Sequence, residues 1–243
     1  MPSVLPIGRV VELWRYPVKS MRGHSLETAV LGWTGIAGDR QYGFVRRMDR
    51  SRFPWLTGRT APRVLLYEPS FAMPDDPRNS ALRVTAPDGI VHDIWDNDLT
   101  SRLSEEAGEP VIPLQVGRGM FDQHPVSVIS TDSFARLDAA FGAKLDRRRF
   151  RINIVIEPEG GSLIEAEWAG RSLAFGEADA PPTLRIDAPI SRCSMVTVDP
   201  VSAARDASVM RVVAQDFDNR VGHYGAPTTR GVIAVGDRVY LRR

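Results

Sequence analysis

The sequence predicts a mainly β (α+β) fold made of barrel-like parts with few short helices. Short segments with alternating apolar and polar residues, or with β-branched runs, recur along the whole chain, and this is the pattern of strands. Only three segments have the spacing of helices. The 20 glycines and 18 prolines among 243 residues suit a chain with many turns. About a dozen short strands with three helices favour a barrel over a layered α/β fold.

The strands come first, because they make up most of the chain. The first is interrupted near Pro6 and Gly8, and Pro87-Asp88-Gly89 is the turn of a hairpin. In chain order, we predict strands over residues 4–16, 26–31, 42–47, 64–68, 82–86, 90–94, 111–116, 126–129, 151–156, 172–175, 183–187, 195–198, 231–234 and 238–241.

The three predicted helices cover residues 99–107, 131–141 and 202–214. The first ends at Gly108, and Ser202 is placed to cap the third. The second has the clearest signals: Thr131 or Asp132 can cap its start. Gly142 ends it, and one stripe of its surface is apolar, formed by Phe134, Leu137 and Phe141.

We predict two closely packed domains, residues 1–118 and 119–243, because Gly117-Arg118-Gly119 separates a strand-rich front half from a new strand–helix–strand unit. Composition excludes several classes of protein. With 43% apolar and 25% charged residues the chain is not disordered. A net charge of +1 gives no overall attraction to nucleic acid or to an anionic membrane.

No segment has the roughly 18 consecutive apolar residues of a membrane helix. The first fifteen residues lack the pattern of a signal peptide. We therefore expect a cytoplasmic protein that binds neither membrane nor nucleic acid. The single cysteine, Cys193, excludes an internal disulfide and an all-cysteine zinc site.

Several enzyme classes have no signature here. The four histidines show no zinc-ligand spacing and are interpreted as unrelated loop or surface residues: His24, His92, His124 and His223. There is no G-x-S-x-G turn of a serine hydrolase, no P-loop and no G-x-G-x-x-G motif.

An arginine cluster at 147–151 precedes an apolar run. In a strand, Arg149, Arg151 and Asn153 would share one face. That face is either a solvated loop entering a strand or an anion-binding surface, since guanidinium groups match phosphate oxygens. The near-zero net charge argues against a nucleic-acid site.

Cys193 lies in a loop, after Pro189 and Ser191. A lone cysteine is commonly a buried structural thiol. Arg192 beside it could instead stabilise a thiolate. Such a thiolate needs no second cysteine to bind a heavy metal if an organic cofactor supplies the other ligands.

Six motifs, in order, resemble those of the MOSC β-barrel proteins. They are Tyr16-Pro17-Val18-Lys19-Ser20; Gly38-Asp39-Arg40; Thr57-Gly58-Arg59-Thr60-Ala61-Pro62-Arg63; Phe150-Arg151-Ile152-Asn153-Ile154-Val155; Ser191-Arg192-Cys193 with Thr197-Val198-Asp199-Pro200; and Val235-Gly236-Asp237-Arg238-Val239-Tyr240. The branch that includes the mitochondrial amidoxime-reducing components and their bacterial relatives is the most similar.

The resemblance implies an N-terminal MOSC barrel-like domain, a MOSC domain and a bound molybdenum cofactor, molybdopterin with molybdenum. It implies that Cys193 is the metal's thiolate ligand. It implies that the residues at motif positions hold the cofactor: Lys19, Ser20, Arg40, Ser130, Arg151, Asn153, Ser191 and Arg192. Lys19 is one of only two lysines, which suggests that a compact ammonium is needed there. Asp199 is a candidate proton donor, although Asp-Pro is equally a turn.

The resemblance also implies an activity: reduction of small N-hydroxylated compounds such as amidoximes and N-hydroxylated bases. We expect no appended ferredoxin domain, pyridoxal-phosphate domain or membrane anchor. We therefore expect a separate electron donor, a ferredoxin-like protein, a flavoprotein or a b-type cytochrome. One alternative is a carrier that holds the cofactor, or sulfur as a persulfide on Cys193. The other is a non-enzymatic interaction protein that uses the arginine face.

Overall fold

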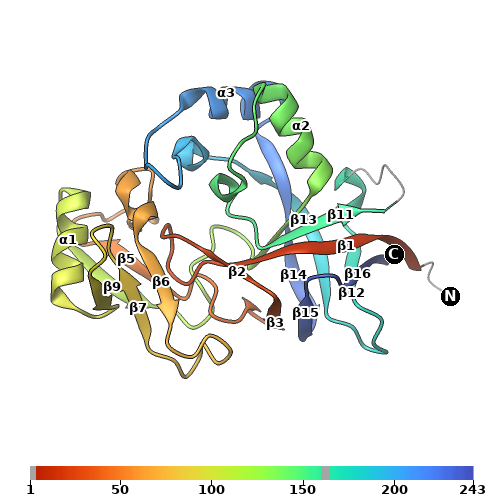
Figure 1. The fold of residues 1–243 in the computed structure, drawn as a ribbon, viewed down its shortest axis with the longest axis horizontal. Coiled ribbons are helices and arrows are strands. Elements are labelled where there is room, and N and C mark those ends of the chain that lie inside the picture. Colours follow the sequence, from red (N-terminus) through yellow and green to blue (C-terminus); the bar gives the residue numbers. More distant parts are fainter. Residues whose placement is uncertain (1–3, 160–164, 243) are drawn as a thin grey trace.

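The computed structural model describes residues 4–159 and 165–242 (Figure 1). Seven strands form a closed barrel because β1 (Val4–Arg15) pairs with both ends of the series. The order is β1, β11 (Ile154–Pro158), β10 (Val126–Ser130), β14 (Arg220–Thr229), β13 (Thr183–Ser191), β12 (Ser172–Phe175) and β16 (Arg238–Arg242). Only β10 and β11 are parallel. The predicted mainly β, barrel-based fold is confirmed.

Strand β1 can serve two neighbours because it is long and bent. It pairs with β16 near its start, with β11 along its second half, and with β2 (His24–Leu26) at its end. The register shifts at Gly8, where a side chain would collide with the Glu157 carbonyl. Glycine there allows the two strands to approach closely.

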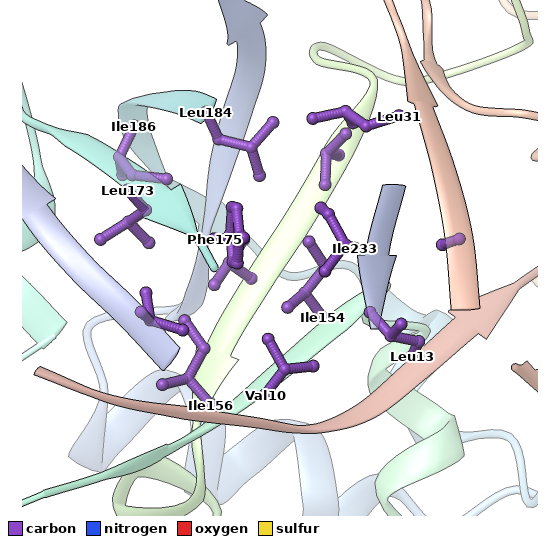
Figure 2. Close-up of a cluster of buried hydrophobic side chains, with 14 of the residues drawn as sticks. Val10, Leu13, Leu31, Ile154, Ile156, Leu173, Phe175, Leu184, Ile186 and Ile233 are labelled. Atoms are coloured by element: carbon purple, nitrogen blue, oxygen red, sulfur yellow. The ribbon is translucent and has the colours of Figure 1, made fainter. Parts of the chain in front are cut away.

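The barrel interior is filled with apolar side chains from the strands of the barrel other than β14. Figure 2 shows Val10 and Leu13 of β1 next to Ile154 of the neighbouring β11, with Phe175 of β12 in the same cluster. Leu31 and Ile233 come from β3 (Thr28–Gly32) and β15 (Gly231–Ala234), which pair with each other, while β4 (Gly35–Ile36) pairs with β3. The interior is therefore packed like a small barrel core, and a ligand site must lie elsewhere.

A second lobe holds its own core and lies on one side of the barrel (Figure 1). It contains β5 (Tyr42–Arg46) paired with β9 (Val111–Gln115). It also contains the sheet β6 (Glu68–Phe71), β7 (Leu82–Thr85) and β8 (Val91–Asp93), and helix α1 (Asn97–Ala107). Strand β1 belongs to the barrel. The chain therefore passes from the barrel to the second lobe near residue 40, and it returns to the barrel near the boundary predicted after Arg118.

Helices α2 (Thr131–Phe141) and α3 (Ala207–Asp216) lie together over one side of the barrel (Figure 1). Helix α2 has the predicted bounds, and its cap is Ser130 rather than Thr131 or Asp132. The helix predicted from Ser202 begins later, at Ala207, because Asp206 caps it and Ser202 is bound in a turn to Asp199.

Two predicted strands are wrong. Residues 64–68 fall largely in the 3₁₀ helix η1 (Pro62–Leu66), which begins with a proline at a position suited to helices. Residues 195–198 fall in η4 (Ser194–Thr197). Residues 147–150 form η2 (Arg147–Phe150), and 165–168 form η3 (Glu165–Trp168). Strand β14 is missing from the predictions because Gly222, Gly225 and Pro227 interrupt its pattern.

Within the described residues, no helix combines the length and apolar character needed to cross a membrane.

Candidate functional site

An open pocket lies where loops of the barrel and of the second lobe meet. Eight of the ten residues predicted for the site line it: Lys19, Ser20, Arg40, Arg151, Asn153, Ser191, Arg192 and Cys193. Segments more than 170 residues apart in the sequence are thereby brought together, as Lys19 and Cys193 show.

Three of these residues have a backbone conformation that non-glycine residues rarely adopt. The φ angles are 67° at Ser20, 49° at Arg40 and 51° at Arg151. The described chain has six such non-glycine residues, so half of them lie at one pocket. Left-handed backbone is strained, and such strain clusters at binding sites. The fold therefore holds these three side chains in fixed directions at an energetic cost.

Two arginines lie against the ring of the buried Tyr16. The guanidinium carbon is 4.8 Å from the ring centroid for Arg40 and 4.3 Å for Arg151. Burial raises the pKa of Tyr16 to about 12. The phenol therefore stays neutral at physiological pH and presents a π face to both cations.

Arg40 is firmly held. It pairs with the Asp39 carboxylate and donates to Asn153 Oδ1 at 3.2 Å and to the Arg151 carbonyl at 2.9 Å. Burial lowers the pKa of Arg40, but Asp39 outweighs burial, and the net shift is upward. This guanidinium therefore also connects the segments that carry Asn153 and Arg151.

Arg151 has an unsatisfied donor. Its Nη1 donates to the Met21 carbonyl at 2.7 Å, while Nη2 is buried and has no hydrogen-bond partner among the described residues. Burial, with the nearby charge of Arg40, lowers the pKa of Arg151 to about 10. A buried cationic donor without an acceptor is unfavourable. An anionic oxygen bound in the pocket would satisfy it.

Lys19 is the compact cation of the pocket. Its Nζ donates to the Met120 carbonyl at 2.9 Å and to Asp122 at 2.7 Å, and lies 5.2 Å from the centroid of the Phe53 ring. Burial lowers the pKa of Lys19, and Asp122 opposes that effect. Asp122 is about half exposed, at 53%. An incoming anion would compete with this carboxylate for the ammonium.

Cys193 is exposed at the start of η4, and two arginines fix the chain around it. On one side, Arg192 donates to the Val221 carbonyl from Nε and Nη2, at 2.9 and 2.6 Å, and to the Phe150 carbonyl at 2.8 Å. Burial lowers the pKa of Arg192 to about 10. Through these bonds Arg192 holds the loop that carries Cys193. Its side chain therefore shapes the pocket by binding the carbonyls of Phe150 and Val221.

On the other side, Arg149 donates to the Thr197 carbonyl at 3.0 Å and to Asp199 at 2.7 Å. Asp199 also accepts from the Val201 and Ser202 amides. Burial raises the pKa of Asp199, but these hydrogen bonds and Arg149 outweigh it and hold the pKa below its usual range. An ionised, ion-paired carboxylate is poorly suited to give up a proton. Asp199 lies just outside the pocket lining, and its catalytic role stays a prediction.

Ser130 also lies outside this pocket. Its side chain caps α2 by accepting from the Ser133 amide at 3.1 Å, and it donates to Glu165 at 3.0 Å. Glu165 in turn lies 3.1 Å from His223. Burial raises the pKa of Glu165, but bonds from His223, Ser133 and Ser130 lower it overall. Ser130 therefore belongs to a second buried network, formed with Ser133, Glu165 and His223.

Some lining residues were not singled out by sequence reasoning: Phe53, Asp122, His124 and Tyr224. The first three belong to loops, and Tyr224 belongs to the glycine-interrupted strand β14. The motif Thr57–Arg63 was a usable signal for the loop carrying Phe53, because Thr57 and Arg59 also line the pocket. Nothing in the spacing of residues 117–125 indicated that this loop borders the pocket.

The pocket offers one thiol and several cationic side chains. No group of three or more histidine, cysteine or acidic side chains suited to a metal ion is found in residues 4–159 and 165–242. A metal bound at Cys193 would need most of its ligands from elsewhere. The donor set therefore fits an anionic organic cofactor that brings its own sulfur ligands.

Two family models match the chain. The MOSC N-terminal beta barrel domain matches residues 7–107, and the MOSC domain matches residues 115–240. No protein with a curated description matches the sequence.

Solved structures with a similar fold share little sequence with the chain. The YUAD protein from Bacillus subtilis is 12% identical, with a TM-score of 0.53, over 100% of this chain and 98% of that one. A hypothetical protein is 9% identical, with a TM-score of 0.46, over 99% of this chain and 69% of that one. YiiM from Geobacillus stearothermophilus is 15% identical, with a TM-score of 0.34, over 48% and 53%. The likeness to the YUAD protein supports the fold alone.

Proposed function

The chain belongs to the MOSC family, some of whose members bind the molybdenum cofactor, and from this premise we propose that its pocket binds molybdopterin with molybdenum. The observation that carries the proposal is a juxtaposition. The exposed thiol of Cys193 lines the same pocket as the buried, unsatisfied Nη2 of Arg151. A soft metal needs the first group, and the phosphate of the cofactor needs the second.

The cations of the pocket have separate tasks in this proposal. Lys19, Arg40 and Arg151 gather around Tyr16 and Phe53 and would hold the phosphate, which must be neutralised when it leaves water. Ser20 and Asn153 line the same pocket. Asn153 would hold Arg40 in place, because its Oδ1 accepts from that guanidinium and from Ser127. The backbone strain at Ser20, Arg40 and Arg151 fits this role, because a preformed site need not be ordered on binding.

Cys193 would ligate the metal as a thiolate. Arg192 and Arg149 would keep the two ends of its loop in place through the carbonyls of Phe150, Val221 and Thr197. Ser191 borders the metal side of the pocket. A ligand loop that is fixed at both ends keeps its thiolate aimed into the pocket.

We further propose that the protein is an oxidoreductase that reduces small N-hydroxylated compounds, amidoximes and N-hydroxylated bases, with electrons from a separate redox protein. When bound, the metal supplies the exchange of two electrons. The residues of the chain bind, orient and protonate. The open mouth of the pocket beside Cys193 supports access by a small molecule.

The test is metal content followed by turnover. Protein made in a host that supplies the cofactor should contain about one molybdenum per chain by elemental analysis. Cys193→Ala should lower that content by more than about tenfold, because removing even an outer contact of a metal ligand weakens binding 10- to 100-fold. The surface variant Arg9→Ala, on a side chain that is 54% exposed and outside the pocket lining, is the control and should leave the molybdenum content unchanged. Wild-type protein without molybdenum overturns the proposal.

Turnover separates the reductase from the carrier alternative. Metal-loaded protein with a reduced viologen dye should consume benzamidoxime or hydroxylaminopurine. The exposure of Cys193 also suits a carrier of the cofactor, or of sulfur as a persulfide. Loaded protein that is inert toward every N–OH compound favours that alternative.

A further inference from the structure

Reduction of an N–OH group needs protons as well as electrons. The N–O bond breaks, two electrons enter from the reduced donor protein, and two protons are taken up. The products are an N–H group and water. A proton-donating side chain must therefore face the pocket, and such groups contribute about 10²- to 10⁴-fold to rates. This requirement rests on the function proposed above.

The acidic side chains near Cys193 are already engaged. Asp122 is paired with Lys19 at 2.7 Å, and Asp199 with Arg149 at 2.7 Å. Burial, with Asp122, raises the pKa of Tyr224, so the phenol holds its proton. None of these three groups readily delivers a proton at neutral pH.

His124 is placed differently. It lines the pocket, and its side chain is 35% exposed, so it contacts both the pocket and bulk water. Its Nδ1 lies 3.3 Å from an Asp187 carboxylate oxygen, and its ring centroid is 5.7 Å from that of Tyr224. The carboxylate orients the imidazole through Nδ1, which leaves Nε2 as the nitrogen that can exchange a proton with the pocket.

We propose that His124, positioned by Asp187, delivers the proton to the N-hydroxylated substrate in the Cys193 pocket and is recharged from bulk water. An imidazole beside a carboxylate is a common proton-transfer arrangement, because histidine changes charge near physiological pH. Asp187 sets which nitrogen faces inward.

The charged groups around His124 come from three sides. Asp187 of β13 faces it and lies 3.6 Å from Arg185. Tyr224 of β14 lies against its ring, and Asp122, on the same loop, is paired with Lys19. The Asp187 carboxylate is thus the charge nearest to the ring.

The test compares wild type with His124→Gln. The variant should keep its molybdenum content and its KM, while kcat with benzamidoxime falls at least about 100-fold. In the wild type, kcat should decline as rising pH removes the donated proton; in the variant that decline should vanish. Added imidazole should restore part of the variant's kcat. Asp187→Asn should lower kcat by about tenfold, because the ring loses its orienting partner.

The matched control is His92→Gln. His92 also lies beside a carboxylate, 3.2 Å from Asp96, but in the second lobe and outside the pocket lining. It should leave kcat and the pH profile unchanged. As a readout independent of turnover, NMR of the cofactor-free protein should show that Asp187→Asn alters the titration of the His124 ring.

Equal kcat in wild type and His124→Gln overturns the assignment while the proposed function stands. A loss of kcat that imidazole does not rescue, with an unchanged pH profile, assigns His124 a structural role and also overturns it. A wild type that turns over no N–OH compound overturns the proposed function and this inference with it.

Discussion

The barrel interior and the pocket at its edge are built in opposite ways. Inside the barrel, Phe175, Leu184 and Ile156 are at most 1% exposed and are surrounded by other apolar side chains. At the pocket, Lys19 and Arg151 bury charge, and the backbone at Ser20, Arg40 and Arg151 is strained. Burying an apolar side chain stabilises a fold by about 1.5–3 kcal/mol, whereas buried charge and strain oppose folding.

From this contrast we expect stability and binding to be supplied by separate parts of the molecule. The free energy gained by burying apolar side chains in the barrel offsets the cost of buried charge and strained backbone at the pocket. The same strand can serve both, as β1 does by packing Val10 inside the barrel and then leading to Tyr16 and Lys19 at the pocket. The four predictions below test this separation.

The largest effect is expected inside the barrel. Phe175→Ala should lower the free energy of unfolding by about 3–5 kcal/mol, through lost burial and the cavity left behind. Urea unfolding measures it. Molybdenum content per folded molecule should stay close to that of the wild type, and a selective loss of metal would contradict the separation.

Arg151→Ala should weaken cofactor binding and leave stability nearly unchanged. Cofactor occupancy should fall by about tenfold or more, while the free energy of unfolding changes by less than about 2 kcal/mol. Only the bond to the Met21 carbonyl and the stacking on Tyr16 are lost, and an unsatisfied buried donor is removed with them. Metal analysis and urea unfolding on the same preparation decide the matter. Global unfolding of the variant would assign Arg151 to the scaffold.

Glu165→Gln tests the second buried network. The pKa of Glu165 is lowered in the folded protein, so its contribution is present above its ordinary value of 4.5 and is lost as pH falls through the folded pKa. The variant should be about 1–3 kcal/mol less stable at pH 7, and the gap should narrow as the pH falls below 4.5. Unfolding curves at several pH values measure the gap. A gap that is constant with pH would show that the charge of Glu165 contributes nothing.

The smallest effect is expected from relieving strain. Ser20→Gly suits a φ of 67° and should change stability by no more than about 1 kcal/mol, yet it should lower cofactor occupancy because the pocket becomes less rigid. Ala203→Gly, at a φ of 59° outside the pocket lining, is the matched control. Ala203→Gly should change stability by about as much as Ser20→Gly does and should leave cofactor occupancy unaffected. Equal occupancy in both variants would show that the conformation at Ser20 does not serve binding.

Sequence reasoning predicted the barrel well because alternation and β-branched runs report local burial directly. It missed β14, where glycines and a proline break the alternation while pairing with β10 and β13 still forms the strand. It also predicted a strand over 195–198, where a 3₁₀ helix follows Cys193. Tertiary pairing decides such segments, and local pattern does not contain it.

For the pocket too, sequence reasoning reached the residues that carry a local signal and missed those placed by tertiary structure. Residues in short motifs, such as Lys19, Arg40, Arg151 and Cys193, were found from the sequence. His124 was interpreted as an unrelated loop or surface histidine because its partner, Asp187, is distant in sequence. Which side chain borders a pocket depends on how loops meet in space.

The pairing of β1 with β16 has a consequence for how the protein is made. The barrel closes only after β16 has left the ribosome, because β16 pairs with β1 more than 220 residues earlier in the sequence. The second lobe, residues 42–115, has its own core and can fold earlier. Long-range pairing of this kind slows folding. We therefore expect the cofactor pocket, which needs both parts, to be the last region completed during synthesis.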